Sequence, residues 1–186
     1  MRLFPAFFFL AVCGMLAAGE PNSIINGDFK LGSAGFGVWR LVRSDLNPKL
    51  ENLPLSVEDG RLVLRNPYGE YFQLRSAEFN LPAHTTARFH TQFEGPSGKL
   101  SFCILRITPA GKWLIHRRDI RANGKSQEVE ITFDTAENGG AYMLLVYSPE
   151  KRTPAGIYRF SSFRLNAGNA FGDIHAAVAV DKPLFT

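Results

Sequence analysis

Cysteine is scarce in this chain, whose 186 residues include only two, Cys13 and Cys103. Because Cys13 lies in the apolar N-terminal stretch, the folded region has no partner for an internal disulfide, and a hydrophobic core has to stabilise it. Cys103 lies in the apolar run LSFCILRI, where a cysteine is expected to be a small buried side chain and not a reactive thiol.

Long apolar runs are also lacking after the N-terminus. Arg2 precedes a largely apolar stretch at residues 3–16, and Ala17-Ala18-Gly19 supplies the small residues of a cleavage site. This pattern predicts a signal peptide at residues 1–19, and hence a secreted, periplasmic or cell-surface protein. Cys13 leaves a lipid anchor as the alternative to soluble export. No second membrane span is predicted.

Charge is close to balanced, with 21 Lys and Arg against 17 Asp and Glu and a formal net charge of +4. A protein that binds nucleic acid usually gathers its cations into one stripe, whereas the arginines here fall on separate segments. We therefore predict no nucleic-acid partner. The dispersed arginines are Arg61, Arg65, Arg75, Arg88, Arg106, Arg121, Arg159 and Arg164.

The patterns expected of an enzyme are missing as well. Glycoside hydrolysis needs two carboxylates facing one cleft, but Glu58-Asp59 precedes a glycine as in a turn, and Glu128 and Glu130 lie on a solvent-facing side. There is no Gly-x-Ser-x-Gly elbow, and the four histidines lack metal-ligand spacing. We predict a non-catalytic chain without a cofactor, any catalysis being in a domain downstream.

Short segments of β type, separated by turns, are what the sequence contains instead. They recur at intervals of about 8–14 residues, the spacing of a sandwich or barrel, and in QEVEITFD the apolar side chains Val129, Ile131 and Phe133 share one face. This predicts an all-β, antiparallel sandwich of two sheets. The expected strands lie near residues 38–43, 61–66, 71–79, 86–94, 100–108, 113–120, 127–134, 142–148 and 157–165.

The ends of this β region carry the motifs NSIINGDFKLGSAGFGVW and GIYRFSSFRLN, with GEYFQLRSAEFNLPAHTTARFHTQF between them. These motifs resemble the carbohydrate-binding modules of the 4/9 family type, from Asn22 to Asn166. The resemblance implies a galactose-binding-like jelly-roll domain at residues 20–166, whose first and last strands are neighbours. It also implies a polysaccharide or oligosaccharide ligand and a possible glycoside hydrolase domain downstream.

The chain departs from this family at three positions. Many related modules hold a structural calcium ion through a glutamate after the first Phe and an aspartate of the last strand, where Lys30, Ser161 and Ser162 stand here. Calcium prefers carboxylate oxygens, so we expect no metal. Either the ammonium group of Lys30 replaces the ion, or Lys30 is simply an exposed lysine.

Sugar binding would depend on aromatic rings, which stack on the C–H faces of pyranoses, and on planar polar groups that pair with hydroxyls. Tyr71, Gln73 and Arg75 alternate with apolar residues and are expected to line an open groove. Trp113 and Tyr147 are the candidate stacking partners.

For Trp113, however, core packing is favoured over binding. Strict alternation in KWLIHRRDI places Trp113, Ile115 and Arg117 on one side of a strand.

Two roles remain open for the domain. It is either a non-catalytic carbohydrate-binding module of an exported, multidomain protein that acts on polysaccharide, or a structural jelly roll that has lost sugar binding and packs against a catalytic partner domain. An exposed aromatic platform would favour the first role, and a face filled with aliphatic or long charged side chains the second.

The C-terminal residues are expected to lie outside this domain. Residues 167–173 are small and turn-rich, which predicts a linker. Residues 174–186 begin with an alternating apolar pattern, which predicts the first strand of a further domain, or else an added edge strand of the sandwich.

Overall fold

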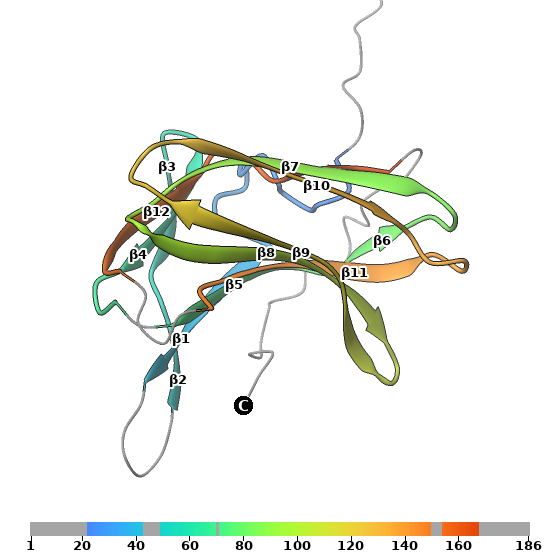
Figure 1. Ribbon diagram of the computed structural model, residues 1–186, viewed down its shortest axis with the longest axis horizontal. Helices are drawn as coiled ribbons and strands as arrows, with labels where there is room; N and C mark the ends of the chain where they lie inside the picture. The colour runs from blue at the N-terminus through green and yellow to red at the C-terminus, as the bar shows by residue number, and fades with distance from the viewer. Residues whose placement is uncertain (1–21, 43–48, 70, 150–153, 168–186) are drawn as a thin grey trace, which may run out of the picture.

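The computed structural model describes residues 22–42, 49–69, 71–149 and 154–167 (Figure 1), with the backbone only at 39–42 and 49–51. The predicted signal peptide, the linker from residue 168 onward and the predicted strand at 174–186 lie outside these residues. Within them, no helix has the length and apolar character needed to cross a bilayer.

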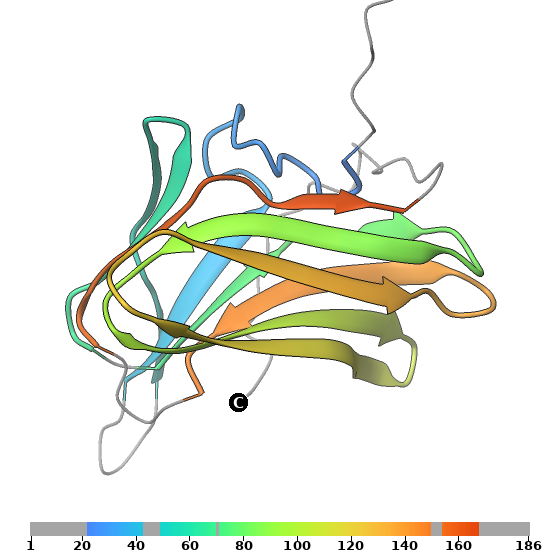
Figure 2. The ribbon, with the colours of Figure 1, turned by 45° about the horizontal axis from the view of Figure 1, so that its top comes forward.

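The described chain forms two antiparallel sheets packed face to face (Figures 1 and 2). Sheet A has seven strands in the order β2-β1-β5-β11-β8-β9, with β6 paired to β11, and sheet B has six in the order β10-β7-β12-β4-β3, with β13 paired to β7. The all-β sandwich predicted from the sequence is thus confirmed. The strands of sheet A are β1 (Phe36–Val42), β2 (Lys49–Asn52), β5 (Phe72–Ser76), β6 (Phe79–Leu81), β8 (Gly98–Thr108), β9 (Gly111–Ala122) and β11 (Gly140–Tyr147). Those of sheet B are β3 (Leu55–Glu58), β4 (Arg61–Asn66), β7 (Thr86–Glu94), β10 (Gln127–Asp134), β12 (Gly156–Phe160) and β13 (Arg164–Asn166).

The expected strands agree with the observed ones except where the chain changes direction. β4, β7 and β10 have the predicted bounds. The segment expected at 71–79 is divided into β5 and β6, and that at 157–165 into β12 and β13, because Ser161 N turns to donate to Gln92 O (2.9 Å). β2 and β3 were not predicted, since both are short and Pro54, which cannot donate in a ladder, lies between them.

Phenylalanine fills the space between the sheets. Phe93 of sheet B and Phe102 of sheet A are fully buried, with ring centroids 5.7 Å apart, and Phe160 and Phe163 meet at 5.3 Å. Burying a side chain of this size stabilises a fold by about 1.5–3 kcal/mol. Because Cys103 is a free thiol, this packing and not a disulfide joins the two described sheets.

The N-terminal segment Asn22–Gly27 runs along the last strand. Ser23 N donates to Leu165 O (2.8 Å) and Phe163 N to Gly27 O (2.8 Å). The first and last strands themselves are in different sheets, since β1 pairs with β2 and β5, whereas β13 pairs with β7. The expectation that they are neighbours is wrong for the strands, because the segment before β1 occupies that place.

Lys30 lies in the loop that follows this segment and is exposed. Its Nζ is 2.8 Å from Asp28 Oδ2, and 82% of its side-chain surface is accessible. The hydrogen bond from Lys30 lowers the pKa of Asp28. The loop is held instead by Asn26, whose Nδ2 donates to Gly32 O and Ala34 O, both at 2.9 Å. Of the two explanations for Lys30, the exposed lysine is the one that the structure supports, and the ammonium substitute for calcium is wrong.

Candidate functional site

The side of sheet A that faces away from sheet B carries most of the predicted site residues. In β5, Phe72 and Leu74 point into the core, so Gln73 and Arg75 point outward. Antiparallel partners share a face, and β11 therefore adds Leu145 and Tyr147. We call this the outer face of sheet A; its members include Tyr71, Gln73, Arg75, Ser101, Cys103, Leu105, Leu114, Arg117, Asp119, Leu145 and Tyr147.

Two tyrosines and an arginine stack across this face. The ring centroids of Tyr71 and Tyr147 are 6.2 Å apart with an interplanar angle of 55°. Arg117 Cζ lies 5.5 Å from the centroid of Tyr147, a cation–π distance. Both tyrosines are partly exposed and Arg117 is exposed, so a ligand can reach all three groups.

Gln73 and Arg75 lie beneath this layer and are almost completely buried, at 2% and 3% exposure. The expectation that they line an open groove is therefore wrong for these two side chains. Gln73 is flanked by two larger residues of the same face, since it pairs with Tyr147 and its Nε2 donates to Tyr71 OH (2.7 Å). Burial also lowers the pKa of Arg75, to about 10, and raises that of Tyr71. Gln73 thus orients the Tyr71 hydroxyl from below.

Trp113 is separated from the other candidates by a β-bulge. Cys103 pairs with Arg117 and Ile104 with His116, but Leu105 pairs with Leu114, so one extra residue of β9 falls between. The bulge puts Trp113, the partner of Arg106, on the opposite face from Arg117. Both sequence interpretations of this residue were wrong: it does not share a side with Arg117, and at 58% exposure it is not packed in the core.

A carboxylate that the sequence analysis did not single out fixes Arg117. Asp119 Oδ1 accepts from Arg117 Nε (2.7 Å) and from Ser101 Oγ (2.6 Å), and its Oδ2 lies 2.8 Å from Lys99 Nζ. Burial by itself would raise the pKa of Asp119. The three donors outweigh this effect and hold the pKa well below its ordinary value. The spacing of Arg117 and Asp119, two apart on one strand, was the available signal.

Aliphatic side chains occupy the centre of the same face. Cys103, Leu105 and Leu145 form a small buried cluster with Tyr147 packed against it. Burial raises the pKa of the Cys103 thiol to about 11, so the thiol is not a nucleophile near neutral pH. This agrees with the prediction that Cys103 is a buried, inert side chain.

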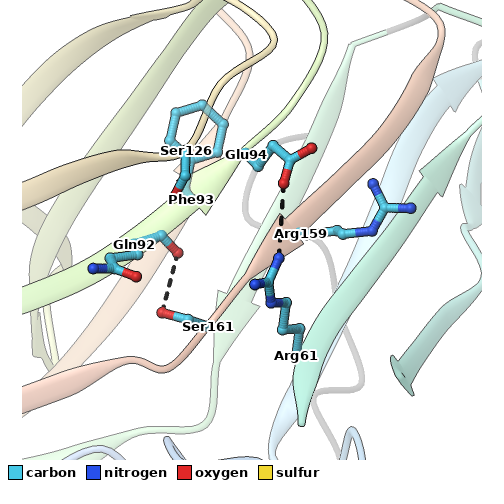
Figure 3. A pocket seen from close by; sticks show the side chains of 7 residues that line it. All are labelled: Arg61, Gln92, Phe93, Glu94, Ser126, Arg159 and Ser161. Carbon is cyan, nitrogen blue, oxygen red and sulfur yellow. Dashed lines mark hydrogen bonds and ion pairs between the residues drawn. The ribbon is translucent and has the colours of Figure 1, made fainter. Parts of the chain in front are cut away.

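A small depression lies on the outward side of sheet B (Figure 3). Arg61 points toward Glu94 there, at 3.7 Å, with Arg159 beside them, and Ser161 Oγ lies 3.4 Å from Gln92 O. Glu94 is the one carboxylate among its lining residues, so it lacks the pair that glycoside hydrolysis needs. Throughout the described residues, no group of three His, Cys, Asp or Glu side chains is placed to hold a metal ion.

Comparison with solved structures relates the fold of this chain to that of carbohydrate-binding modules. No family model matches the sequence, and no curated protein matches it. Among solved structures, a module of family CBM4 superimposes with a TM-score of 0.58 at 13% identity, over 78% of this chain and 99% of that one. TmCBM61, solved in complex with β-1,4-galactotriose, gives 0.51 at 16% identity over 80% and 99%. The enzymatically active domain of bacteriophage CBA120 tailspike protein 4 gives 0.60 at 8% identity, over 78% of this chain but 21% of that one. These likenesses show that the chain has the jelly-roll fold found in carbohydrate-binding modules of several families.

Proposed function

We propose that the chain is a non-catalytic carbohydrate-binding module and that it binds polysaccharide or oligosaccharide on the outer face of sheet A. The observation that carries the proposal is the stack of Tyr71, Tyr147 and Arg117 on a solvent-accessible sheet face. Aromatic rings present a surface for the C–H faces of a sugar, while the guanidinium and the Tyr71 hydroxyl can pair with its hydroxyl groups.

The finer assignment rests on the sequence. The terminal motifs favour the 4/9 family type, and residues 1–19 favour export to the periplasm, the cell surface or the medium. Residues 174–186 favour a continuation into a further domain, such as a glycoside hydrolase. We include Tyr71, Tyr147 and the underlying Gln73 and Arg75 in the site. Trp113 is left out because it lies on the opposite face.

Affinity gel electrophoresis against a panel of neutral and acidic soluble polysaccharides tests this proposal. We expect at least one glycan to retard the protein. Tyr147→Ala and Tyr71→Ala should each weaken that retention by about fivefold to tenfold, since a stacked ring contributes on the order of 1 kcal/mol. Trp113→Ala is the matched aromatic control and should leave retention unchanged. Equal losses in all three variants would refute the proposed face.

One observation favours the alternative role as a structural jelly roll packed against a catalytic partner domain. Cys103, Leu105 and Leu145 make the centre of the outer face aliphatic, and such a surface suits a protein neighbour as well as a sugar. Failure of every glycan to retard a protein that melts normally would favour this role.

A further inference from the structure

The hairpin formed by β8 and β9 ends in an exposed apolar tip. Three consecutive residues of β9 are exposed there: Trp113 at 58%, Leu114 at 56% and Ile115 at 39%. The end of the hairpin curls away from sheet B (Figure 1). Exposed apolar groups gathered in this way are typical of an interaction site. We call residues 109–115 the hairpin tip.

Apolar side chains lie on both faces of this tip. Trp113 shares a face with its partner Arg106, and its Nε1 donates to Thr108 Oγ1 (3.1 Å). Leu114 shares the other face with its partner Leu105. A flat protein or glycan surface would cover one of these faces and leave the other wet. A lipid layer into which the tip inserts covers both.

The hairpin also carries a concentrated positive charge. Between Gly98 and Ala122 there are six lysines and arginines and one carboxylate, although the whole chain has a net charge of only +4. Asp119 pairs with Lys99 and Arg117, which leaves the hairpin strongly cationic. The expectation of evenly dispersed charge therefore does not hold for this element. Of its cations, Arg106 and Lys112 lie at the tip, whereas Arg117, Arg118, Arg121 and Lys99 lie farther along the hairpin toward its base.

The hairpin is less well suited to two other partners, an added protein strand and nucleic acid. β9 is the edge strand of sheet A, but its bulge beside Ile115 and the charged run from Arg117 to Asp119 are devices that discourage strand addition by a second chain. Nucleic acid would be complementary to the cations and could stack a base on Trp113, but it would leave Leu114 and Ile115 exposed to water.

We propose that the hairpin tip inserts into the surface of an anionic lipid bilayer, with Trp113, Leu114 and Ile115 among the acyl chains and the long side chains of Lys112 and Arg106 extended to the headgroups. Membrane-surface segments combine these two contributions, apolar insertion and attraction of Lys and Arg to anionic lipids. Tryptophan in particular favours the boundary between headgroups and acyl chains. Trp113 lies on the face opposite to the proposed glycan site, whereas Leu114 lies at the margin of the outer face of sheet A beside Leu105; neither residue is part of the Tyr71–Tyr147 stack.

Vesicle co-sedimentation of the full chain tests the proposal, with phosphatidylcholine vesicles that contain or lack phosphatidylglycerol. We expect binding to the anionic vesicles, weakened by added salt. The double variant Trp113→Ala/Leu114→Ala should reduce it by about tenfold or more, because the inserted apolar area is lost. The matched control Tyr68→Ala/Leu31→Ala removes an aromatic and a leucine that are as exposed, at 62% and 72%, on other loops. It should bind like the wild type.

Tryptophan emission gives an independent readout. Trp39 and Trp113 are the only tryptophans, so a blue shift on addition of anionic vesicles that disappears in Trp113→Phe, while binding persists, would support insertion of the tip. Equal loss of binding in both double variants would overturn the proposal, as would the absence of vesicle binding. Binding of duplex DNA or RNA in preference to vesicles would also overturn it, and so would self-association that the Trp113→Ala/Leu114→Ala variant abolishes.

Discussion

At the scale of single residues, Asp119 organises the most exposed part of the proposed glycan site. Its carboxylate accepts hydrogen bonds from Ser101 and Arg117 and forms an ion pair with Lys99. The guanidinium of Arg117 in turn lies over the Tyr147 ring. Without the carboxylate, the long Arg117 side chain would keep its charge but lose the bond that fixes its position. We therefore expect Asp119 to be a positioning residue for Arg117.

Asp119→Asn should lower the stability of the domain in a pH-dependent way. The folded-state pKa of Asp119 is depressed from its ordinary 3.8. Its charged form therefore stabilises the fold above that value, and the contribution is lost as pH falls from 3.8 toward the folded-state pKa. We expect urea denaturation to show the largest gap between wild type and variant near neutral pH, and a shrinking gap below about pH 4. Lys99→Gln and Arg117→Gln should each reproduce part of the gap. A gap that does not change with pH would contradict this assignment.

At the scale of elements, the N-terminal segment is bonded to the end of the described chain at β13, although it forms turns and not a strand. Its contact with Phe163, just before β13, is so close that Gly27 has no room for a side chain: a Cβ at this position would overlap Phe163 O and approach Asn22 Nδ2. We call this contact of residues 22–27 with residues 163–165 the seam. It includes two hydrogen bonds of Asn22, from its Nδ2 to Phe163 O (2.7 Å) and from Leu165 N to its Oδ1 (2.9 Å).

Gly27→Ala should open this seam. We expect it to lower the free energy of unfolding by about 1–3 kcal/mol, as overpacking does, and to accelerate hydrogen exchange at the Phe163 amide, whose acceptor is Gly27 O. Gly32→Ala is the control, because nothing lies within 4 Å of its added Cβ. Its φ of +65° adds a backbone strain that Gly27 does not have, but Gly32→Ala should leave exchange at Phe163 unchanged. Unchanged exchange in Gly27→Ala would show that the seam tolerates a methyl group.

The elements also show how far the sequence predicts this molecule. Strands with strict alternation, such as Gln127–Asp134, were predicted to the residue because one face is core and the other solvent. The parity of Tyr71, Gln73 and Arg75 follows from the same rule. The bulge in β9 interrupts this alternation, because one extra residue moves Trp113 to the other face. The hydrophobic periodicity of the sequence does not indicate where the extra residue lies. The burial of Gln73 and Arg75 depends on neighbouring strands and was equally inaccessible.

At the scale of the whole molecule, stability depends on rings shared between the two sheets. Phe102 of β8 contacts Phe89 and Phe93 of β7 and Phe160 of β12, with centroid distances of 6.5, 5.7 and 6.3 Å. One side chain of sheet A thus meets two strands of sheet B. Farther along the same hairpin, the large side chain of Trp113 is exposed, so burial differs sharply within one element.

Phe102→Ala should therefore destabilise the domain by about 3–5 kcal/mol, because it removes a fully buried ring and leaves a cavity. Trp113→Ala, on the same hairpin, should change the free energy of unfolding by no more than about 0.5 kcal/mol. Equilibrium urea denaturation measures both values. A similar loss in the two variants would mean that the exposed tip, and not only the ring between the sheets, contributes to the folded state.

The seam between the N-terminal segment and β13 also determines how the domain responds to tension. Ser23 bonds to Leu165 and Gly27 to Phe163, so both ends of the described chain leave this antiparallel pair at the same side. A force that pulls residues 22 and 167 apart therefore acts in the unzipping geometry, in which these hydrogen bonds break one after another. In the shear geometry they would all bear the force together. The domain would lengthen first by releasing this segment, at low force, while the phenylalanine core still holds the two sheets together.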